Sequence, residues 1–379
     1  MNLGWDATGT PLCFYGTYPT SYTVSRILEK AAREAGFPVL RCHEQFVEEP
    51  LTSPQFGRLW RLMPYAARYA GAARRLRRQL DRCPAEILIA GFRGQFDVLL
   101  ARLLNQTRSR RIVFAPLVTL LETGVDRGLV ADRSRAARLL AWLDRKSLEL
   151  SQRVVIDTYA HADYLQAKFG TRRDKIRVFH LGCDTDVFRQ RAVRPQESSM
   201  RVLFYGSLLP LHGVETIVTA ASLLRREPRI QFTICGEGWC RPTPSTRIGE
   251  LENIRWMSWV SYEKIPDLIE QHDVCLGVFS GNEKAAMVIP NKVYQSAAVG
   301  RTVVSANTPA IREVFTHGEN IWLVPPGHPE ALADALLYLL AHPGDRAALA
   351  SRAAEFMGEQ FSSAAQAERF AVNFVAGLN

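Results

Sequence analysis

Short apolar runs alternate with longer amphipathic stretches along the whole chain. In the first half, the stretches 97–106 and 135–150 have the three-to-four-residue apolar spacing of helices packed on one face. The apolar runs between such stretches predict β-strands. Strands separated by helices are typical of an α/β fold with a parallel, doubly wound sheet. The strands predicted for this half are 12–16, 38–43, 87–92, 111–117, 154–160 and 176–182.

The alternation restarts after a polar, proline-containing segment, 191–199, which indicates a linker. We therefore predict two domains, 1–193 and 194–360, followed by a C-terminal helix within 361–379 that packs back on the first domain. The second domain is predicted to end with a helix at 329–340. Its predicted strands are 201–206, 230–238, 254–260, 273–280, 302–307, 311–315 and 321–326.

Each half opens with a strand that ends in the same three residues, Phe-Tyr-Gly, at 14–16 and at 204–206. Glycine permits a sharp turn from strand to helix and lets a ligand approach the backbone. In open α/β sheets, ligands bind at the carboxyl ends of the strands. The repeat therefore predicts a ligand site at the start of each half.

Composition narrows the choice of partners. The formal net charge of the 379 residues is +9, which favours anionic partners such as nucleotides or anionic lipid. Nucleic acid is not expected, because no strand combines basic residues with stacking aromatics. The chain has no apolar run long enough to span a membrane and no N-terminal signal pattern, so we expect a cytoplasmic protein.

The seven cysteines form no CxxC pair. Cys13, Cys235 and Cys275 lie in apolar, strand-like runs. Buried free thiols in a reducing compartment explain these positions better than disulfides or zinc.

The stretch 58–82 mixes arginine with leucine, tryptophan and tyrosine. One interpretation is an interfacial helix on an anionic membrane, which would place the protein peripherally at the inner face. The alternative is a solvated, arginine-rich helix, and Pro64 is expected to interrupt either one.

Several motifs of the second half occur together: FYGSLLPLHGVETI, FTICGEG, WVSYEKIPDLIEQ and IPNKVYQSAAVGRTVV. In this combination the chain resembles the C-terminal domain of family-four (group 1) glycosyltransferases of the GT-B architecture. The first half resembles a branch of the same family more weakly, through FYGTYP, GFRGQFD and DTYAHADYL. The resemblance implies two Rossmann-like domains facing a central cleft, with acceptor bound by 1–193 and nucleotide-sugar donor by 194–360.

Relative to the family pattern, the first donor loop is altered. The family places an arginine after the glycine that corresponds to Gly206 and a lysine before Gly213; here these positions are Ser207 and His212. A histidine beside a diphosphate can carry part of the missing charge. The alternative is that His212 only caps or packs against the helix.

The second donor motif is altered too. The family's two glutamates correspond here to Met287 and Gln295. Gln295 can still hydrogen-bond ribose hydroxyls, and Glu283 is a candidate to replace the lost carboxylate. Asn291 is expected to cap a helix, and Lys292 in its first turn is expected to add a full charge at the diphosphate.

The resemblance and the predicted strand ends together give the candidate residues. Trp259 and Val260 fall in the base-binding loop, with a core aromatic as the alternative for Trp259. Tyr18 and His161 could equally be packing residues. The candidates are Asp157 and Glu283 for catalysis; Gly206, Ser207, His212, Gly213, Gly236, Glu237, Val260, Asn291, Lys292 and Gln295 for the donor; and Gly16, Thr17, Tyr18, Arg93, Gln95 and His161 for the acceptor.

No metal or other cofactor is expected. Asp184 and Asp186 form a DxD pair, which binds metal in another glycosyltransferase architecture, but here it follows a strand and leads into the linker. We interpret it as a structural turn.

The implied activity is transfer of a sugar, with retention of configuration, to a glycan, a lipid-linked molecule or a small-molecule acceptor. Two alternatives remain open: a sugar-nucleotide epimerase of the same architecture, and a non-catalytic subunit that binds a partner glycosyltransferase. The non-catalytic subunit remains an alternative because the family's two glutamates and its arginine are replaced in this chain.

Overall fold

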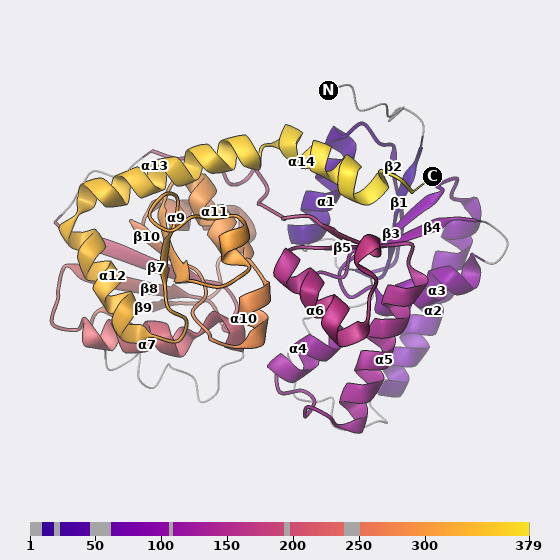
Figure 1. Ribbon diagram of the computed structural model, residues 1–379, viewed down its shortest axis with the longest axis horizontal. Coiled ribbons are helices and arrows are strands. Elements are labelled where there is room, and N and C mark those ends of the chain that lie inside the picture. Colours follow the sequence, from indigo (N-terminus) through magenta and orange to yellow (C-terminus); the bar gives the residue numbers. More distant parts are fainter. Residues whose placement is uncertain are drawn as a thin grey trace. The chain divides into compact units, whose positions relative to one another are not determined.

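The computed structural model describes residues 10–18, 23–45, 62–105, 109–192, 198–238 and 251–378. The chain forms two compact units: Met1–Leu181 with Ser363–Asn379, and Gly182–Ser362. Each unit contains a six-stranded, all-parallel sheet with helices around it (Figure 1). This confirms the prediction of two doubly wound, Rossmann-like units.

In the first unit the strand order is β2-β1-β3-β4-β5-β6. The strands are nearly continuous apolar runs because helices cover both faces of a parallel sheet. The elements are β1 (Leu12–Gly16), α1 (Thr23–Glu34), β2 (Val39–His43), α2 (Leu62–Arg82), β3 (Ile87–Ala90), α3 (Gln95–Leu104), β4 (Arg111–Phe114), α4 (Leu120–Asp126), α5 (Arg135–Leu150), β5 (Arg153–Ile156), α6 (Tyr159–Phe169), a 3₁₀ turn (Arg173–Lys175) and β6 (Ile176–Val178).

In the second unit the strand order is β12-β11-β10-β7-β8-β9. The elements are β7 (Met200–Tyr205), a 3₁₀ turn (Pro210–His212), α7 (Val214–Leu223), β8 (Ile230–Cys235), β9 (Ile254–Met257), a 3₁₀ turn (Tyr262–Lys264), α9 (Ile265–Glu270), β10 (Val274–Leu276), α10 (Glu283–Met287), α11 (Asn291–Val299), β11 (Thr302–Ala306), a 3₁₀ turn (Ile311–Glu313), β12 (Trp322–Val324), α12 (Pro329–Ala341) and α13 (Pro343–Gln360).

The division between the units lies at Leu181 and Gly182, earlier in the chain than the predicted boundary after residue 193. The reason is that the segment before the linker packs on the second unit. The backbone N–H of Arg191 donates to Val299 O at 3.1 Å, and Arg301 donates to Ala192 O at 2.9 Å.

The C-terminal segment belongs to the first unit. It forms α14 (Ser363–Phe370) and a π-helical turn (Ala371–Val375), and α14 lies beside α1 (Figure 1). The rings of Phe37 and Phe370 are 6.3 Å apart, and Gln366 Nε2 donates to Leu181 O at 2.5 Å.

Two local predictions are wrong. Residues 311–315 do not form a strand, because Thr308 Oγ1 accepts from the N–H of Ile311 at 3.3 Å and starts a 3₁₀ turn. The helix α2 is not interrupted at Pro64, because this proline lies in its first turn, where no backbone donor is needed.

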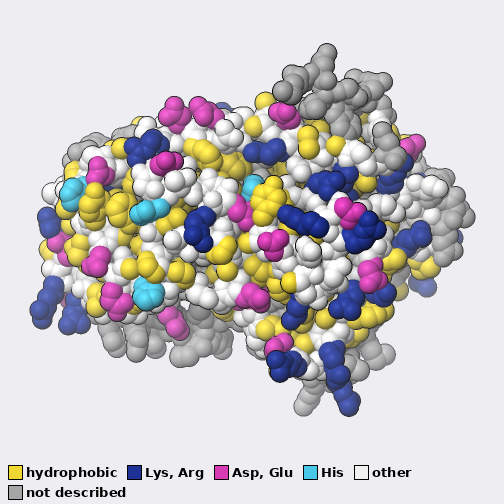
Figure 2. Space-filling model, in the orientation of Figure 1, with side chains coloured by type: hydrophobic (Ala, Val, Ile, Leu, Met, Phe, Trp, Pro, Cys, Tyr) yellow, Lys and Arg dark blue, Asp and Glu magenta, His cyan; other side chains and the backbone are white. Residues whose placement is uncertain are grey.

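The apolar face of α2 is directed inward. Ala72, Leu76 and Leu80 are buried in the core, while its arginines, Arg74, Arg75, Arg77 and Arg78, are exposed. Figure 2 shows Lys and Arg interspersed with Asp and Glu on the face in view. Within the described ranges, no helix has the length and apolar character needed to cross a membrane.

Candidate active site

A buried lysine lies at the carboxyl end of β7. Lys292, in the first turn of α11, is 6 % exposed, and its Nζ has no hydrogen-bond partner among the described residues. The ammonium lies 3.8 Å from the centroid of the Phe204 ring. Burial lowers the pKa of Lys292 well below its usual range. An unpaired buried cation is costly, so this position is suited to an anionic ligand.

The loop after β7 leaves room for that ammonium. A Cβ on Gly206 would lie 3.3 Å from Lys292 Nζ, and the backbone of Gly206 has φ +129°. Gly206 and Ser207 are half-buried, so the cation lies just beneath the surface of this loop. A side chain at residue 206 would crowd the Lys292 ammonium.

His212 is buried beside this lysine. Burial, and then the charge of Lys292, lower the pKa of His212 well below its usual range. Its Nδ1 donates to the carbonyl of Ser207, since a carbonyl can only accept. His212 is therefore neutral in the free protein, and its partial charge beside a bound diphosphate stays a prediction.

Two further glycines of the predicted donor site, Gly213 and Gly236, lie in close contact with the backbone of another loop. A Cβ on Gly213, which has φ +63°, would be 2.5 Å from the backbone N of Ser280. A Cβ on Gly236 would be 2.1 Å from Gly206 O. Any side chain at these two positions would push the loops apart, so both glycines fix the shape of the site.

Gln295 is directed into the second unit. It is 4 % exposed, and its Oε1 accepts from the hydroxyl of Tyr205 at 2.9 Å. This contact ties α11 to β7. The hydroxyl of Tyr205 occupies the amide oxygen of Gln295, and the ribose contact of this residue stays a prediction.

The N-terminus of α11 also differs from the prediction. Pro290, not Asn291, takes the cap position of α11, and Asn291 is the first helical residue. Glu283 is exposed in the first turn of α10, which Asn282 caps through a bond to the N–H of Ala285 at 2.8 Å. Met287 is buried at the end of the same helix.

The predicted base-binding loop follows β9. Trp259 is 62 % exposed, so the alternative of a core aromatic is wrong. Val260 is half-buried. Glu237 is exposed after β8, and its carbonyl accepts from the N–H of Leu208 at 3.2 Å.

In the first unit, the loop after β1 is held by a buried carboxylate. Asp97 accepts from the N–H of Thr17 at 2.8 Å and from the hydroxyl of Tyr69 at 3.0 Å. Burial raises the pKa of Asp97 to about 6, although these hydrogen bonds oppose the shift. A Cβ on Gly16 would lie 2.4 Å from Asp97 Oδ2, so this contact requires glycine.

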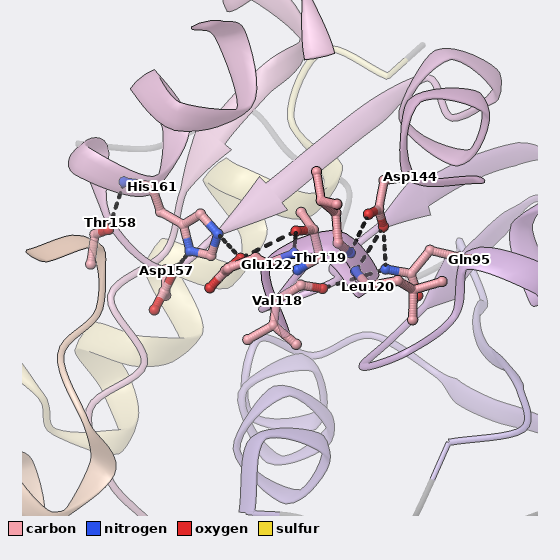
Figure 3. A network of polar contacts seen from close by, with 10 residues as sticks. Gln95, Val118, Thr119, Leu120, Glu122, Asp144, Asp157, Thr158 and His161 are labelled. Carbon is pink, nitrogen blue, oxygen red and sulfur yellow. Dashed lines mark hydrogen bonds and ion pairs between the residues drawn. The ribbon is translucent and has the colours of Figure 1, made fainter. Parts of the chain in front are cut away.

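The carboxylate after β5 belongs to a buried ionic network (Figure 3). His161 Nδ1 lies 2.9 Å from Asp157 Oδ1, and His161 Nε2 lies 3.2 Å from Glu122 Oε2. Burial alone would lower the pKa of His161, but Glu122 and then Asp157 outweigh it and raise the pKa to about 10. The imidazolium between two carboxylates positions Asp157, which is 6 % exposed.

Three predicted acceptor contacts are packing residues instead. His161 is fully buried, and Gln95 is 1 % exposed, with Nε2 donating to Asp144 Oδ1 at 3.0 Å (Figure 3). Tyr18 is 2 % exposed. Arg93 is half-buried, and its guanidinium lies 4.9 Å from the centroid of the Phe92 ring.

The sequence analysis missed two acidic residues of this network. Glu122 completes a capping box with Thr119 at the start of α4, and a threonine followed by glutamate three residues later is a readable signal. Asp144 accepts from the N–H groups of Leu120 and Leu121 at 3.0 and 2.9 Å. The only sequence signal for Asp144 is that a charged residue stands among the apolar positions on the buried side of α5.

The DxD pair forms a turn. Asp184 Oδ1 accepts from the N–H of Asp186 at 3.1 Å, and Asp186 lies 3.6 Å from Arg189. These local contacts agree with the interpretation of the pair as a structural turn.

Comparison with known proteins gives the family. Residues 30–187 match the family model described as Glycosyltransferase Family 4, and residues 199–342 match the one described as Glycosyl transferases group 1. The chain belongs to the group 1, family-four glycosyltransferases. The two matches cover most of both units, which confirms the resemblance seen in the motifs.

Individual relatives of this glycosyltransferase are distant. It is 24% identical over 319 residues to alpha-D-kanosaminyltransferase of Streptomyces kanamyceticus, which covers 79% of this chain and 78% of that protein. It is 27% identical over 175 residues to amylovoran biosynthesis glycosyltransferase AmsK of Erwinia amylovora, covering 45% of this chain and 43% of that one. The chain spans about half the length of several of its curated relatives.

Solved structures confirm the GT-B fold. Sucrose-phosphate synthase from Thermosynechococcus elongatus matches with a TM-score of 0.73 at 17% identity, covering 96% of this chain and 98% of that one. HepE of Anabaena, solved in complex with UDP-glucose, matches with a TM-score of 0.66 at 16% identity and the same coverage. At these identities the likeness concerns the fold of this glycosyltransferase.

Proposed function

We propose that the protein transfers a sugar from a nucleotide-diphosphate sugar to a glycan, lipid-linked or small-molecule acceptor, with retention of configuration. The second unit binds the donor, and the first unit binds the acceptor. Family membership supports sugar transfer, and the unpartnered ammonium of Lys292 supports the class of donor. A diphosphate brings two negative charges beside the buried amino group of Lys292 and favours its protonated form.

The remaining donor contacts follow from the same loops. Gly206, Ser207 and Gly236 bring backbone close to the diphosphate, and exposed Trp259 supplies a stacking surface for the base. In the first unit, Asp157 is the catalytic carboxylate, with its orientation set by His161. Glu283, on α10 of the second unit, supplies a second carboxylate. The names of the relatives support sugar transfer as well, since they describe glycosyltransferases.

Three measurements test this proposal: release of nucleoside diphosphate, the configuration of the product, and activity in EDTA. Incubation with a panel of nucleotide-diphosphate sugars should release nucleoside diphosphate, and the anomeric configuration of the product, read by NMR, should equal that of the donor. Activity should survive EDTA, because Lys292 and the loop amides meet the leaving-group charge. Inversion, or loss of activity restored by magnesium or manganese, would contradict the mechanism.

A thermal-shift screen with nucleoside diphosphates separates the alternatives. A ligand at 100 times its dissociation constant stabilises the fold by about 2.7 kcal/mol. Absence of any shift would favour the non-catalytic subunit. A shift accompanied by an isomerised sugar nucleotide, with no acceptor present, would indicate an epimerase.

Contact with an anionic membrane remains a separate proposal, through the exposed arginines of α2. Because the apolar side of α2 is buried in the core, any binding must be electrostatic and should weaken as salt rises. The protein should sediment with anionic vesicles at low salt and not with neutral ones. Replacing Arg74, Arg77 and Arg78 with glutamine should abolish this; equal sedimentation with neutral vesicles would contradict it.

A further inference from the structure

Three cysteines from distant parts of the first unit converge in its interior. Cys13 is on β1, Cys42 is on β2, and Cys83 directly follows α2. Their Sγ atoms all lie within 4.8 Å of one another. The three residues are 0%, 3% and 6% exposed, respectively. The sequence analysis interpreted Cys13 as an isolated buried thiol, since no spacing in the chain links it to the other two.

The strand register argues against a disulfide between the two strand cysteines. Cys13 is paired with Leu40, and Cys42 is paired with Tyr15, so the cysteines are two positions out of register. With strands about 4.8 Å apart and a rise of about 3.3 Å per residue, their Cα atoms are roughly 8 Å apart. This exceeds the ~7 Å beyond which a disulfide requires backbone movement.

The same geometry suits a shared metal ion. Thiolate sulfurs bind zinc at about 2.3 Å, which places the sulfurs of one ion about 4 Å apart. The three side chains therefore need only small rotations to reach a common ion. Side chains too far out of register to bond to one another can still point to a single position between them.

A buried arginine supplies the balancing charge. Arg110 is 7 % exposed, and its guanidinium donates to Cys83 O at 2.6 Å, to Leu80 O at 2.9 Å and to Ala85 O at 3.0 Å. These contacts hold the segment that carries Cys83. A divalent ion with three thiolates has a net charge of −1, which one guanidinium neutralises.

We propose that Cys13, Cys42 and Cys83 form a three-thiolate site for one thiophilic divalent ion of the zinc and cadmium class. Binding follows M²⁺ + 3 RSH → [M(SR)₃]⁻ + 3 H⁺, so no oxidant or reductant is required. Within the described ranges no fourth His, Cys, Asp or Glu joins this group, which leaves one coordination position open. The ion links β1, β2 and the end of α2, and β1 carries the Gly16–Thr17 loop.

The test uses the full chain, reduced and freed of metal, titrated with Cd²⁺. We expect one Cd²⁺ per chain, thiolate-to-cadmium absorption in the ultraviolet, release of up to three protons and a higher melting temperature. Zn²⁺ should compete, and Mg²⁺ should not. Cys42→Ser should weaken binding by more than the roughly 10–100-fold that loss of a residue supporting a metal ligand costs.

The matched control is Cys275→Ser, which removes a buried cysteine of β10 in the second unit. It should leave Cd²⁺ binding unchanged. Because Cys42→Ser can disturb the core, its far-UV circular dichroism is compared with wild type, and Cys83→Ala provides a second variant outside the strands. In wild type, Cd²⁺ should also protect Cys13, Cys42 and Cys83 from alkylation, read by peptide mass spectrometry. Folded wild-type protein that binds no Cd²⁺, or binding that survives in both folded variants, would overturn the proposal.

Discussion

Replacing Lys292 with methionine is expected to weaken the binding of nucleoside diphosphates by about 1.5–3 kcal/mol, or roughly 10- to 150-fold. The ammonium is the charge that meets the diphosphate, and methionine keeps most of the side-chain volume without it. Binding of the bare nucleoside should change little, since base and ribose contact other loops. Isothermal calorimetry of both ligands with wild type and Lys292→Met measures the difference.

The same substitution should make the unliganded fold more stable. In the free protein Lys292 Nζ is buried with no hydrogen-bond partner among the described residues, and its contact with the Phe204 ring returns only part of the desolvation cost. Removing this buried amino group should therefore stabilise the free protein by roughly 1 kcal/mol or more, since a buried polar group without a hydrogen bond is costly in either protonation state. Lower affinity with a higher melting temperature is the signature of a cation kept for a ligand.

The pH dependence follows from the two lowered pKa values. Burial depresses the pKa of both Lys292 and His212, and a bound diphosphate favours their protonated forms. Binding should therefore take up protons and weaken as pH rises, which calorimetry in buffers of different ionisation enthalpy detects. Arg225→Ala, which removes an exposed charge at the end of α7, serves as the control and should change none of these properties. Unchanged diphosphate affinity in Lys292→Met would contradict the placement of the donor.

The fold was predictable from the sequence because buried parallel strands are apolar runs bounded by turn residues. The strand Leu12–Gly16 has the predicted bounds, and α12 starts at the predicted Pro329. The predicted strand 154–160 is too long, because β5 ends at Ile156 and Thr158 caps α6. Capping side chains decide such boundaries, and apolar runs alone do not show them.

The site was predictable only in part. Gly206 and Lys292 lie at a strand end and a helix start, which the local pattern reveals. Whether a polar side chain at such an end faces outward depends on partners far away in the chain. His161 is turned inward by Glu122, and Gln95 by Asp144, and neither pairing follows from sequence spacing. Asn291 lost the cap position because Pro290 has an extended backbone and already occupies it.

Replacing His161 with glutamine is expected to destabilise the first unit by about 3–5 kcal/mol at neutral pH, the usual cost of removing one member of a buried ionic group. Glutamine fills a similar space but leaves Glu122 and Asp157 buried on the two sides of an uncharged side chain. Urea unfolding followed by circular dichroism measures the change. His272→Gln is the matched control, because His272 is also buried and its ring nitrogens bond Leu268 O at 2.7 Å and Thr233 Oγ1 at 2.9 Å.

The stability lost in His161→Gln should depend on pH. The pKa of His161 is raised from 6.5 to about 10 in the folded protein. A group with a raised folded pKa contributes its full stabilisation below the unfolded value and loses it as pH rises through the folded value. The difference in stability between wild type and His161→Gln should therefore be constant below pH 6.5 and shrink steadily toward pH 10. A difference that stays the same across this window would mean that His161 is neutral, and Asp157 would then be positioned by a hydrogen bond without the ion pair.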